Sequence, residues 1–203
     1  MSSIRPFRRG DEPALAEICL RTADAGADAT GVLADDDLWA EIFVLPYVAR
    51  HPEWAWVVEG DDGRLVGYLV GAPDTDAFEE WFAGEWWPQF ADRWPAPQAE
   101  RSRQDGILIY AYGRRPGAEP FSAEYPAHLH IDLLPEAQGQ GLGRRLIDTY
   151  AAALSAAGVR GLHLVADAAN AGAGAFYERI GFDEIPAHDG VRAFAMRLES
   201  TPS

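Results

Sequence analysis

The sequence predicts one domain of the α/β class, in which strands and helices alternate along the chain. A strand pattern at residues 128–134 leads through a glycine-rich loop into a helix pattern at 141–157. A second strand, at 162–166, is followed by a short helix at 172–180. The 203 residues are 48% hydrophobic and 24% charged, which suffices for one core, so we expect a single domain over residues 1–203.

Two helices are predicted after a short first strand. Residues 3–7 have the pattern of that strand, and Asp11 is expected to cap the helix that follows, with Pro13 in its first turn. A second helix is expected to open at residues 35–37. Pro46 is expected to disturb it, because proline lacks the N–H that continues a helix.

Two pairs of strands complete the predicted sheet. The first pair, residues 54–59 and 64–71, is joined by a turn at 61–63 whose Asp-Asp-Gly sequence is typical of hairpins. The second pair, residues 182–185 and 191–198, closes the domain.

Residues 74–126 form a segment of different character, which we interpret as a helical, tryptophan-rich insertion. A helix is predicted up to Pro88. Residues 99–113 fit a second helix, although their alternation also fits a strand. The insertion is expected either to cover the site or to form a partner surface, and exposed tryptophans could make it a homodimer interface. Its tryptophans are Trp81, Trp86, Trp87 and Trp94.

Composition excludes several classes of protein. The net charge of -15 argues against general nucleic-acid binding. No apolar run reaches the roughly 20 residues of a membrane span, and the amino terminus has no apolar signal-peptide stretch, so we expect a cytoplasmic protein without membrane contact. The only cysteine, Cys19, is expected to be buried and inert.

The loop between residues 134 and 141 predicts an anion site. It brings glycines, which let a phosphate approach the backbone, to the positive amino-terminal end of a helix. Arg144 and Arg145 in the first turn can supply further charge. The P-loop lysine is absent, and the glycine spacing differs from the dinucleotide fingerprint. The loop and helix start consist of Gln138, Gly139, Gln140, Gly141, Leu142 and Gly143.

Three segments together resemble the GCN5-related N-acetyltransferase (GNAT) superfamily. Gln138, Gly141 and Gly143 match the family's loop, Gln/Arg-x-x-Gly-x-Gly/Ala. Asn170 and the run Phe-Tyr-Glu-Arg-Ile-Gly-Phe at 176–182 resemble a second family segment. The opening residues resemble its first strand and helix. The resemblance implies a mixed, mostly antiparallel sheet, splayed between the strands at 128–134 and 161–167.

The resemblance also implies acetyl-CoA as the cosubstrate and transfer of its acetyl group to an amine by direct attack. Backbone around Leu133 and Leu134 would bind the pantetheine, and backbone N–H groups of residues 138–144, Arg144 included, would hold the pyrophosphate. Tyr177 would be the general acid that protonates the leaving thiolate, although a core aromatic with a satisfied hydroxyl is the other interpretation. The residues expected along the CoA arm are Asn170, Ala173 and Phe176.

The general base is expected on the strand at 128–134. Alternation puts His128, His130 and Asp132 on one face. We expect Asp132 to be the base, with His130 as the second candidate because histidine titrates near neutral pH. A polar stripe tied up beneath the insertion is the alternative. The same stripe resembles the His-x-His-x-Asp motif of metallo-β-lactamase hydrolases, but its final histidine is replaced by Leu133, and we expect no metal.

A narrower likeness concerns the acetyltransferase-like carboxy-terminal domain of O-GlcNAcase. A helical insertion followed by the run Tyr-Pro-Ala-His-Leu-His-Ile-Asp at 125–132 resembles that domain. Because the domain has been regarded as a pseudo-acetyltransferase in some relatives, a module that binds acetyl-CoA without turning it over is the alternative function. The sequence leaves the amine acceptor open.

Overall fold

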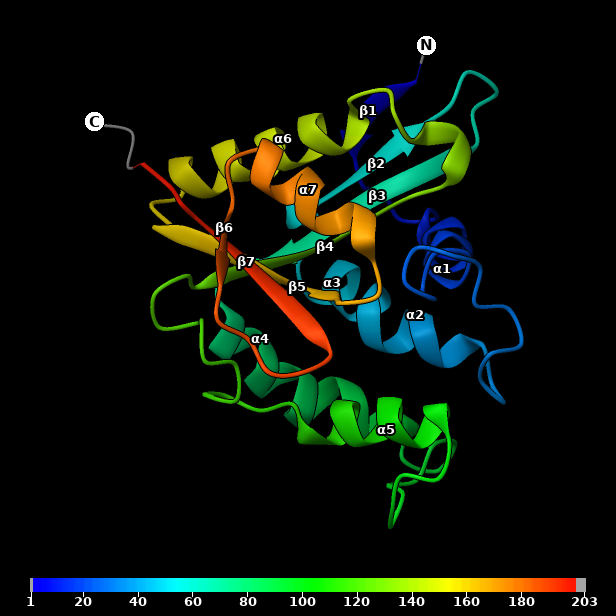
Figure 1. Cartoon of the computed structure of the whole chain (residues 1–203). Helices are drawn as coiled ribbons and strands as arrows, with labels where there is room; N and C mark the ends of the chain where they lie inside the picture. The colour runs from blue at the N-terminus through cyan, green and yellow to red at the C-terminus, as the bar shows by residue number, and fades with distance from the viewer. Residues whose placement is uncertain (1, 200–203) are drawn as a thin grey trace.

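Residues 2–199 are described in a computed structural model, and within them seven strands form one sheet in the order β1-β2-β3-β4-β5-β7-β6 (Figure 1). Neighbouring strands are antiparallel except β4 and β5, which run parallel. The predicted mixed, mostly antiparallel sheet is therefore confirmed. The strands are β1 (Ser3–Pro6), β2 (Ala55–Glu59), β3 (Leu65–Ala72), β4 (Ala127–Leu133), β5 (Gly161–Asp167), β6 (Asp183–Ile185) and β7 (Val191–Arg197).

Helices cover both faces of the sheet (Figure 1). They are α1 (Glu12–Leu20), α2 (Asp37–Phe43), α3 (Leu45–Arg50), α4 (Thr75–Trp81), α5 (Arg103–Gly113), α6 (Leu142–Ala156) and α7 (Ala171–Arg179). On β3, Tyr68 interacts with Cys19 of α1, whereas a side chain at Gly71 would meet Tyr150 of α6. Because successive side chains of a strand alternate between faces, α1 and α6 lie on opposite sides of the sheet.

The amino-terminal helices begin differently from the prediction. The Asp11 side chain does not cap α1; its carboxylate instead accepts from the Arg5 guanidinium at 2.8 and 2.9 Å. Pro46 does not disturb the second helix from within. The helix ends before Val44, whose backbone is not helical. Pro46 lies in the first turn of a new helix, α3, where a missing N–H costs nothing.

The connection between β3 and β4 is helical. After α4 the chain continues through a π-helical turn (Phe82–Trp86) and a 3-10 turn (Trp87–Phe90). Residues 103–113 form the helix α5, so the strand interpretation of this region is wrong. The cause is local: the Ser102 side chain accepts from the N–H of Asp105 at 3.1 Å and caps the helix.

The tryptophans of this connection pack inward. Trp87 and Trp94 are each 3% exposed and stack at a ring-centroid distance of 6.0 Å. Trp81 and Trp86 are partly buried. These side chains therefore form a local aromatic core, which removes the exposed-tryptophan basis for a homodimer interface.

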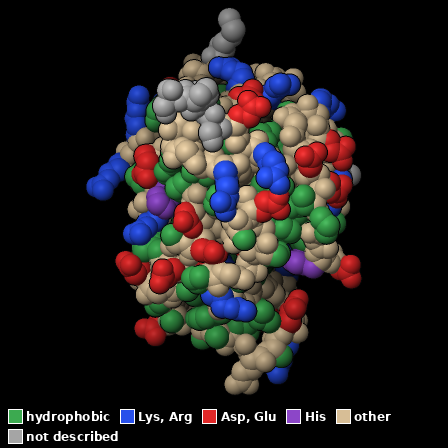
Figure 2. Space-filling model, turned by 90° about the vertical axis from the view of Figure 1, so that its left-hand side faces the viewer, with side chains coloured by type: hydrophobic (Ala, Val, Ile, Leu, Met, Phe, Trp, Pro, Cys, Tyr) green, Lys and Arg blue, Asp and Glu red, His purple; other side chains and the backbone are tan. Residues whose placement is uncertain are grey.

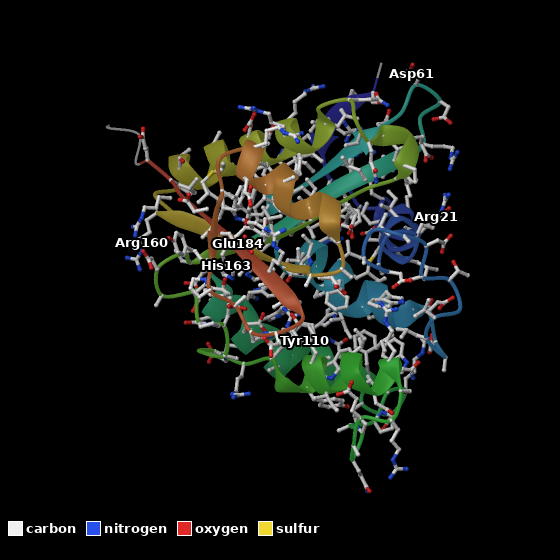
Figure 3. The ribbon with its side chains drawn as sticks, viewed as in Figure 1. Arg21, Asp61, Tyr110, Arg160, His163 and Glu184 are labelled. Atoms are coloured by element: carbon white, nitrogen blue, oxygen red, sulfur yellow. The ribbon has the colours of Figure 1, made fainter. Side chains whose placement is uncertain are left out.

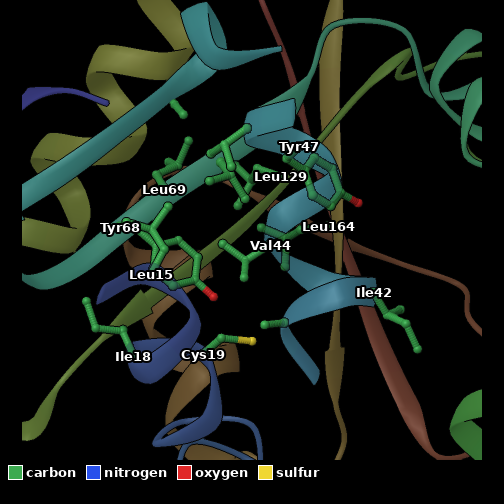
Figure 4. Close-up of a cluster of buried hydrophobic side chains, with 14 of the residues drawn as sticks. Leu15, Ile18, Cys19, Ile42, Val44, Tyr47, Tyr68, Leu69, Leu129 and Leu164 are labelled. Atoms are coloured by element: carbon green, nitrogen blue, oxygen red, sulfur yellow. The ribbon is translucent and has the colours of Figure 1, made fainter. Parts of the chain in front are cut away.

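A hydrophobic cluster between the sheet and α1 to α3 supports the site from below (Figure 4). It includes Cys19, which is 3% exposed, and burial raises the pKa of its thiol above the ordinary value. The expected buried thiol is thus observed. Tyr47 and Tyr68 belong to the same cluster, and both hold polar groups of the site described below.

Acidic and basic side chains are interspersed on the face shown in Figure 2. Within residues 2–199, no helix has the length and apolar character needed to cross a membrane.

Candidate active site

A gap between β4 and β5 is the feature on which the site is built. The strands pair only at Ala127 with Leu162 and at His128 with His163, which lies on β5 (Figure 3). Beyond these pairs, β4 continues along β3 and β5 continues along β7. The predicted splaying is confirmed, and it opens a wedge at the carboxyl end of β4.

Backbone groups of β4 face this wedge. The N–H of Leu134 donates to the carbonyl of Val66, on the β3 side, at 2.9 Å. Because backbone groups alternate between the two sides of an antiparallel strand, those of Ile131 and Leu133 face away from β3. The Leu133 carbonyl accepts from the side-chain amide of Gln138 at 2.9 Å. The remaining groups directed toward the wedge are the N–H of Leu133 and both backbone groups of Ile131.

The two residues predicted to bind the pantetheine, Leu133 and Leu134, differ in whether their backbone groups are already bonded. The backbone of Leu134 is already engaged, because its carbonyl accepts from the N–H of Ala137 at 2.8 Å and its N–H is bonded to Val66. Leu133 keeps its predicted place. Ile131, which was not among the predicted residues, directs its backbone groups to the same side of β4 as Leu133.

The glycine-rich loop leaves a row of backbone N–H groups without partners. The first bond of α6 runs from the N–H of Arg145 to the carbonyl of Gly141. Within residues 2–199, no hydrogen bond from the backbone N–H groups of residues 139–144 is found. The N–H of Gln138 is already bonded, since it donates to the carbonyl of Pro135 at 3.2 Å, and the Gln138 side chain connects the loop to β4.

Glycine is needed at the three positions of the loop for two different physical reasons. Gly139 and Gly141 have φ values of +71° and +74°, a conformation that side chains disfavour, and the space beside them is open. Gly143 has ordinary φ, but a Cβ there would lie 3.0 Å from Cζ of Phe176. Gly143 therefore lets α7 pack directly against the start of α6, which brings Phe176 to the loop.

The remaining loop residues hold its shape or reach solvent. Leu142 is 3% exposed and anchors the first turn of α6 in the core. The Gln140 side chain donates to the carbonyl of Glu136 at 2.7 Å. Arg144 is exposed, 3.6 Å from Asp148, and Arg145 is exposed as well. Both arginines are therefore accessible to an anion at the helix start.

A pocket of about 240 Å³ lies at the wedge and gathers the other predicted residues. Asp132 and His130 enter it from β4 and Tyr177 enters from α7. Asn170 and Ala173 line it from the start of α7, where Asn170 caps the helix by accepting from the N–H of Ala173 at 3.2 Å. The pocket thus brings together two elements that carry sequence motifs, β4 and α7.

A residue of the neighbouring strand β3 holds the Asp132 side chain. It is partly buried, and its carboxylate accepts a hydrogen bond from the Tyr68 hydroxyl, directly across the β3–β4 pair. Burial raises the pKa of Asp132 above its usual range, while the hydrogen bonds from Tyr68 and Thr22 oppose that rise. A carboxylate with a raised pKa is a better proton acceptor than an ordinary one.

Tyr177 presents an unbonded hydroxyl to the same pocket. It is 8% exposed and packs against Phe176, with ring centroids 5.2 Å apart. Burial raises the pKa of Tyr177, and the charge of Asp132 raises it further, so the hydroxyl stays protonated at neutral pH. No hydrogen bond to this hydroxyl is found within the described part of the chain, which disfavours a core aromatic with a satisfied hydroxyl.

One ring nitrogen of His130 is hydrogen-bonded, and the other has no partner among the described residues. Its Nε2 lies 3.1 Å from the hydroxyl of Tyr47. Burial and the nearby Arg114 guanidinium lower the pKa of His130 to about 3, so the ring is neutral at physiological pH. Among the residues from 2 to 199, no three His, Cys, Asp or Glu side chains are grouped as a metal site would require.

Comparison with known proteins identifies the family. A model of the acetyltransferase (GNAT) domain matches residues 103–184. The crystal structure of SsHAT is similar at 39% sequence identity, with a TM-score of 0.92 over 97% of this chain and 98% of that one. The chain belongs to the GNAT acetyltransferases.

Two more distant structures share the fold of this acetyltransferase. The apo form of a mutant agmatine N-acetyltransferase is 18% identical, with a TM-score of 0.63 over 97% of this chain and 99% of the other. YncA from Salmonella typhimurium, solved with its cofactor acetyl-CoA, is 15% identical, with a TM-score of 0.57 over 100% and 97%. As a family member, the chain is an enzyme whose cosubstrate is acetyl-CoA.

Several pocket residues of this acetyltransferase were missed by sequence reasoning. Trp39 and Phe43 of α2 and Thr22 after α1 line the pocket, and Tyr47 and Tyr68 hold its polar groups from behind. These residues come from the first 70 positions, far from the motifs. Only Tyr68 had a usable signal, because it lies opposite Asp132 once the strand register is known.

The Gly141→Ala variant is expected to lose acetyl-CoA affinity by about tenfold, the equivalent of one backbone hydrogen bond. The added methyl would strain the φ of +74° and so shift the backbone that presents the N–H groups of the loop. Isothermal titration calorimetry measures the change. Gly63→Ala is the matched control, since Gly63 has φ of +78°, open surroundings and a place in the β2–β3 turn. Equal affinities in the two variants would contradict the loop's role.

Proposed function

We propose that this acetyltransferase transfers the acetyl group of acetyl-CoA to an amine by direct attack. The observation that carries the proposal is the pocket in which the Asp132 carboxylate and the unbonded Tyr177 hydroxyl meet at the β4–β5 wedge. Aminolysis of a thioester needs a proton acceptor for the amine and a proton donor for the sulfur. The pocket offers one of each.

The donor half of the site is formed by the wedge and the glycine loop. Backbone groups of Ile131 and Leu133 would bind the amides of the pantetheine. The unbonded N–H groups of residues 139–144, with the exposed Arg144, would hold the pyrophosphate. Phe176 joins the two parts, because its ring packs on Gly143 and on Tyr177.

In the proposed reaction, the amine nitrogen attacks the acetyl carbon and the carbon–sulfur bond breaks. The acceptor reacts as the neutral amine, after its ammonium form has released one proton to solvent. The proton that the nitrogen loses in the attack goes to Asp132, and the sulfur takes the proton of Tyr177. The direction of both pKa shifts supports these roles, since Asp132 is made more basic and Tyr177 is kept protonated.

The acceptor half of the pocket fits a cationic amine. Trp39 and Phe43 provide aromatic faces, and Asp132 and Asp167 provide carboxylates. Ammonium groups are attracted both by aromatic faces and by carboxylates. We therefore propose an amine, charged in solution, as the acceptor.

Tyr177→Phe is expected to lower kcat by about 100-fold, because it removes the proposed proton donor without removing the ring. The release of free CoA, measured with a thiol reagent, reports the rate. Tyr112→Phe is the matched control: it removes a hydroxyl bonded to the carbonyl of Trp94 at 2.8 Å on α5, outside the pocket. A Tyr177→Phe enzyme with the activity of that control would remove Tyr177 from the mechanism.

The function as a whole is tested in two steps. Calorimetry with acetyl-CoA should show binding, and no binding at millimolar concentration would refute the proposal. A thiol-release screen across amines should then reveal turnover. Binding without turnover of any amine would favour the acetyl-CoA-binding module that the O-GlcNAcase likeness suggests.

A further inference from the structure

Tyr110, on the helix α5 of the β3–β4 connection, is an aromatic residue that the fold leaves largely uncovered. It is 48% exposed and lies on the side of α5 that faces the sheet (Figure 3). Its ring is nevertheless fixed. It stacks on Phe43 at a centroid distance of 5.8 Å and an angle of 13°, and the Arg114 guanidinium lies 5.8 Å from its centroid. Tyr110 thus presents a rigid aromatic surface to solvent.

Phe43 connects this surface to the pocket. Phe43 lines the pocket, and its ring lies edge-on to the ring of His130 at a centroid distance of 5.8 Å. Phe43 therefore contacts a pocket residue, His130, as well as Tyr110, which is not itself part of the pocket lining. Tyr110 continues the aromatic wall of the pocket outward to the molecular surface.

Val165 adds a second exposed apolar side chain on the same face of the sheet. It is 42% exposed and lines the pocket from β5. The rings of His128 and His163 lie 5.9 Å apart, which places these residues on one face of β4 and β5. Because side chains alternate along a strand, His130 and Val165, each two residues further on, share that face. Val165 and the Phe43 wall therefore flank the pocket on one side of the sheet.

This side of the sheet is opposite the proposed donor site. The unbonded N–H groups are at the start of α6, and α6 and α1 lie on opposite faces. Asp132 bonds to Tyr68, whose side chain interacts with Cys19 of α1, and His130 shares the face of Asp132. The face that carries the aromatic wall is therefore the one left for the acceptor.

The path from the pocket to Tyr110 changes from charged to apolar. Inside the pocket, Asp132 and Asp167 attract an ammonium group. Outside it, the wall consists of the rings of Phe43 and Tyr110. Single exposed apolar side chains are common on proteins, and Ile109, 43% exposed on the same helix, is one of them. Tyr110 differs because its ring is continuous with the pocket lining.

We propose that Tyr110 and Val165 form a second subsite of the acceptor, which binds an aromatic group carried by the amine on a short alkyl chain. The inference rests on the proposed function and narrows the acceptor to arylalkylamines. The amine points toward Asp132, the alkyl chain passes the ring of Phe43, and the aromatic group lies against Tyr110. Aromatic pairs gain stability beyond their buried area, so an aromatic group binds better here than an alkyl group.

Binding is measured by calorimetry on protein saturated with CoA, so that the result does not depend on turnover. The ligands are phenylalkylamines with one to four methylenes between ring and nitrogen, each paired with the alkylamine that lacks the ring. The preference is the ratio of the two Kd values. In the wild type it should grow with chain length and reach about tenfold or more once the phenyl ring passes Phe43, the upper value for an aromatic pair.

Variants assign this preference to Tyr110. Tyr110→Ala should remove most of it for the longest pair, whereas Tyr110→Phe, which keeps the ring, should retain it. Benzylamine, whose ring reaches only Phe43, should bind Tyr110→Ala as it binds the wild type. Ile109→Ala is the matched control, since it shortens an exposed apolar side chain of α5 that does not line the pocket. An unchanged affinity for acetyl-CoA shows that each variant is folded.

Three results would overturn the proposal. They are a wild-type preference that does not change with chain length, a preference that survives in Tyr110→Ala, and tighter binding of the four-carbon diamine than of the four-carbon phenylalkylamine. A dimer in sedimentation that Tyr110→Ala converts to a monomer would also overturn it, by assigning this surface to a second copy of the chain. Failure of the proposed function is distinct: no amine would release CoA, while the preference in Kd would remain.

Discussion

Asp132→Asn is expected to lower kcat by about 10²- to 10⁴-fold, the usual contribution of a positioned general base. The variant should not lose stability. Burial raises the pKa of Asp132, which means that the folded state disfavours its charge, and an amide has no charge to bury. The Asn oxygen can still accept the hydrogen bond from Tyr68. Activity falls while the free energy of unfolding stays constant or increases.

The direction in which kcat changes with pH follows from the role proposed for Asp132. A base must be unprotonated, so wild-type kcat should decline as the pH falls through a pKa that lies above that of an ordinary aspartate. Asp167→Asn is the control within the same pocket; it removes a carboxylate but not the proposed base, and should raise KM more than it lowers kcat. If both variants lose kcat equally, the effect comes from pocket charge and not from proton transfer.

Glu79→Ala is expected to destabilise the fold by about 3–5 kcal/mol, the cost of leaving a buried charge without its partner. Glu79 and Arg114 are 8% and 5% exposed and form two parallel hydrogen bonds of 2.8 Å. The guanidinium also donates to the carbonyl of Ile42 at 3.1 Å and lies 3.8 Å from the centroid of Phe82. The pair joins the β3–β4 connection to α2, and denaturant unfolding measures the loss.

The chain contains a matched control for this variant. Arg192 also bonds both oxygens of a glutamate, Glu184, at 2.8 and 2.7 Å, but this pair is on the surface. Glu184→Ala should change stability little, because water screens exposed ion pairs. A similar loss in both variants would show that burial does not determine the cost.

The elements with a clear period could be predicted from the sequence. Strands β4 and β5 and helix α6 alternate or repeat as expected, and the glycine-rich junction between β4 and α6 indicated where the donor is proposed to bind. The break at Val44 could not be predicted, since proline permits a helix start as well as a helix end. The helix α5 needed its Ser102 cap to be separated from a strand.

The candidate site likewise contains residues that could be predicted from the sequence and residues that could not. Residues on the motifs, such as Asp132 and Tyr177, were predicted because one strand and one helix carry them. The groups that orient them were not, because Tyr47 and Tyr68 reach the site only through the packing of α3 and the register of β3 on β4. Contacts between distant segments leave no local pattern in a sequence.

The wedge between β4 and β5 also bears on how this chain avoids self-association. Unpaired strand edges are a liability, because they invite strands of other chains to add on. Here the unpaired backbone of Ile131 and Leu133 lies inside the sheet, with β5 on its far side and α7 over the adjoining pocket. A further strand could reach these groups only by entering between β4 and β5, which stay paired at Ala127–Leu162 and His128–His163. These unpaired groups are thus kept away from the outer edges of the sheet, where strand addition is usually a route to aggregation.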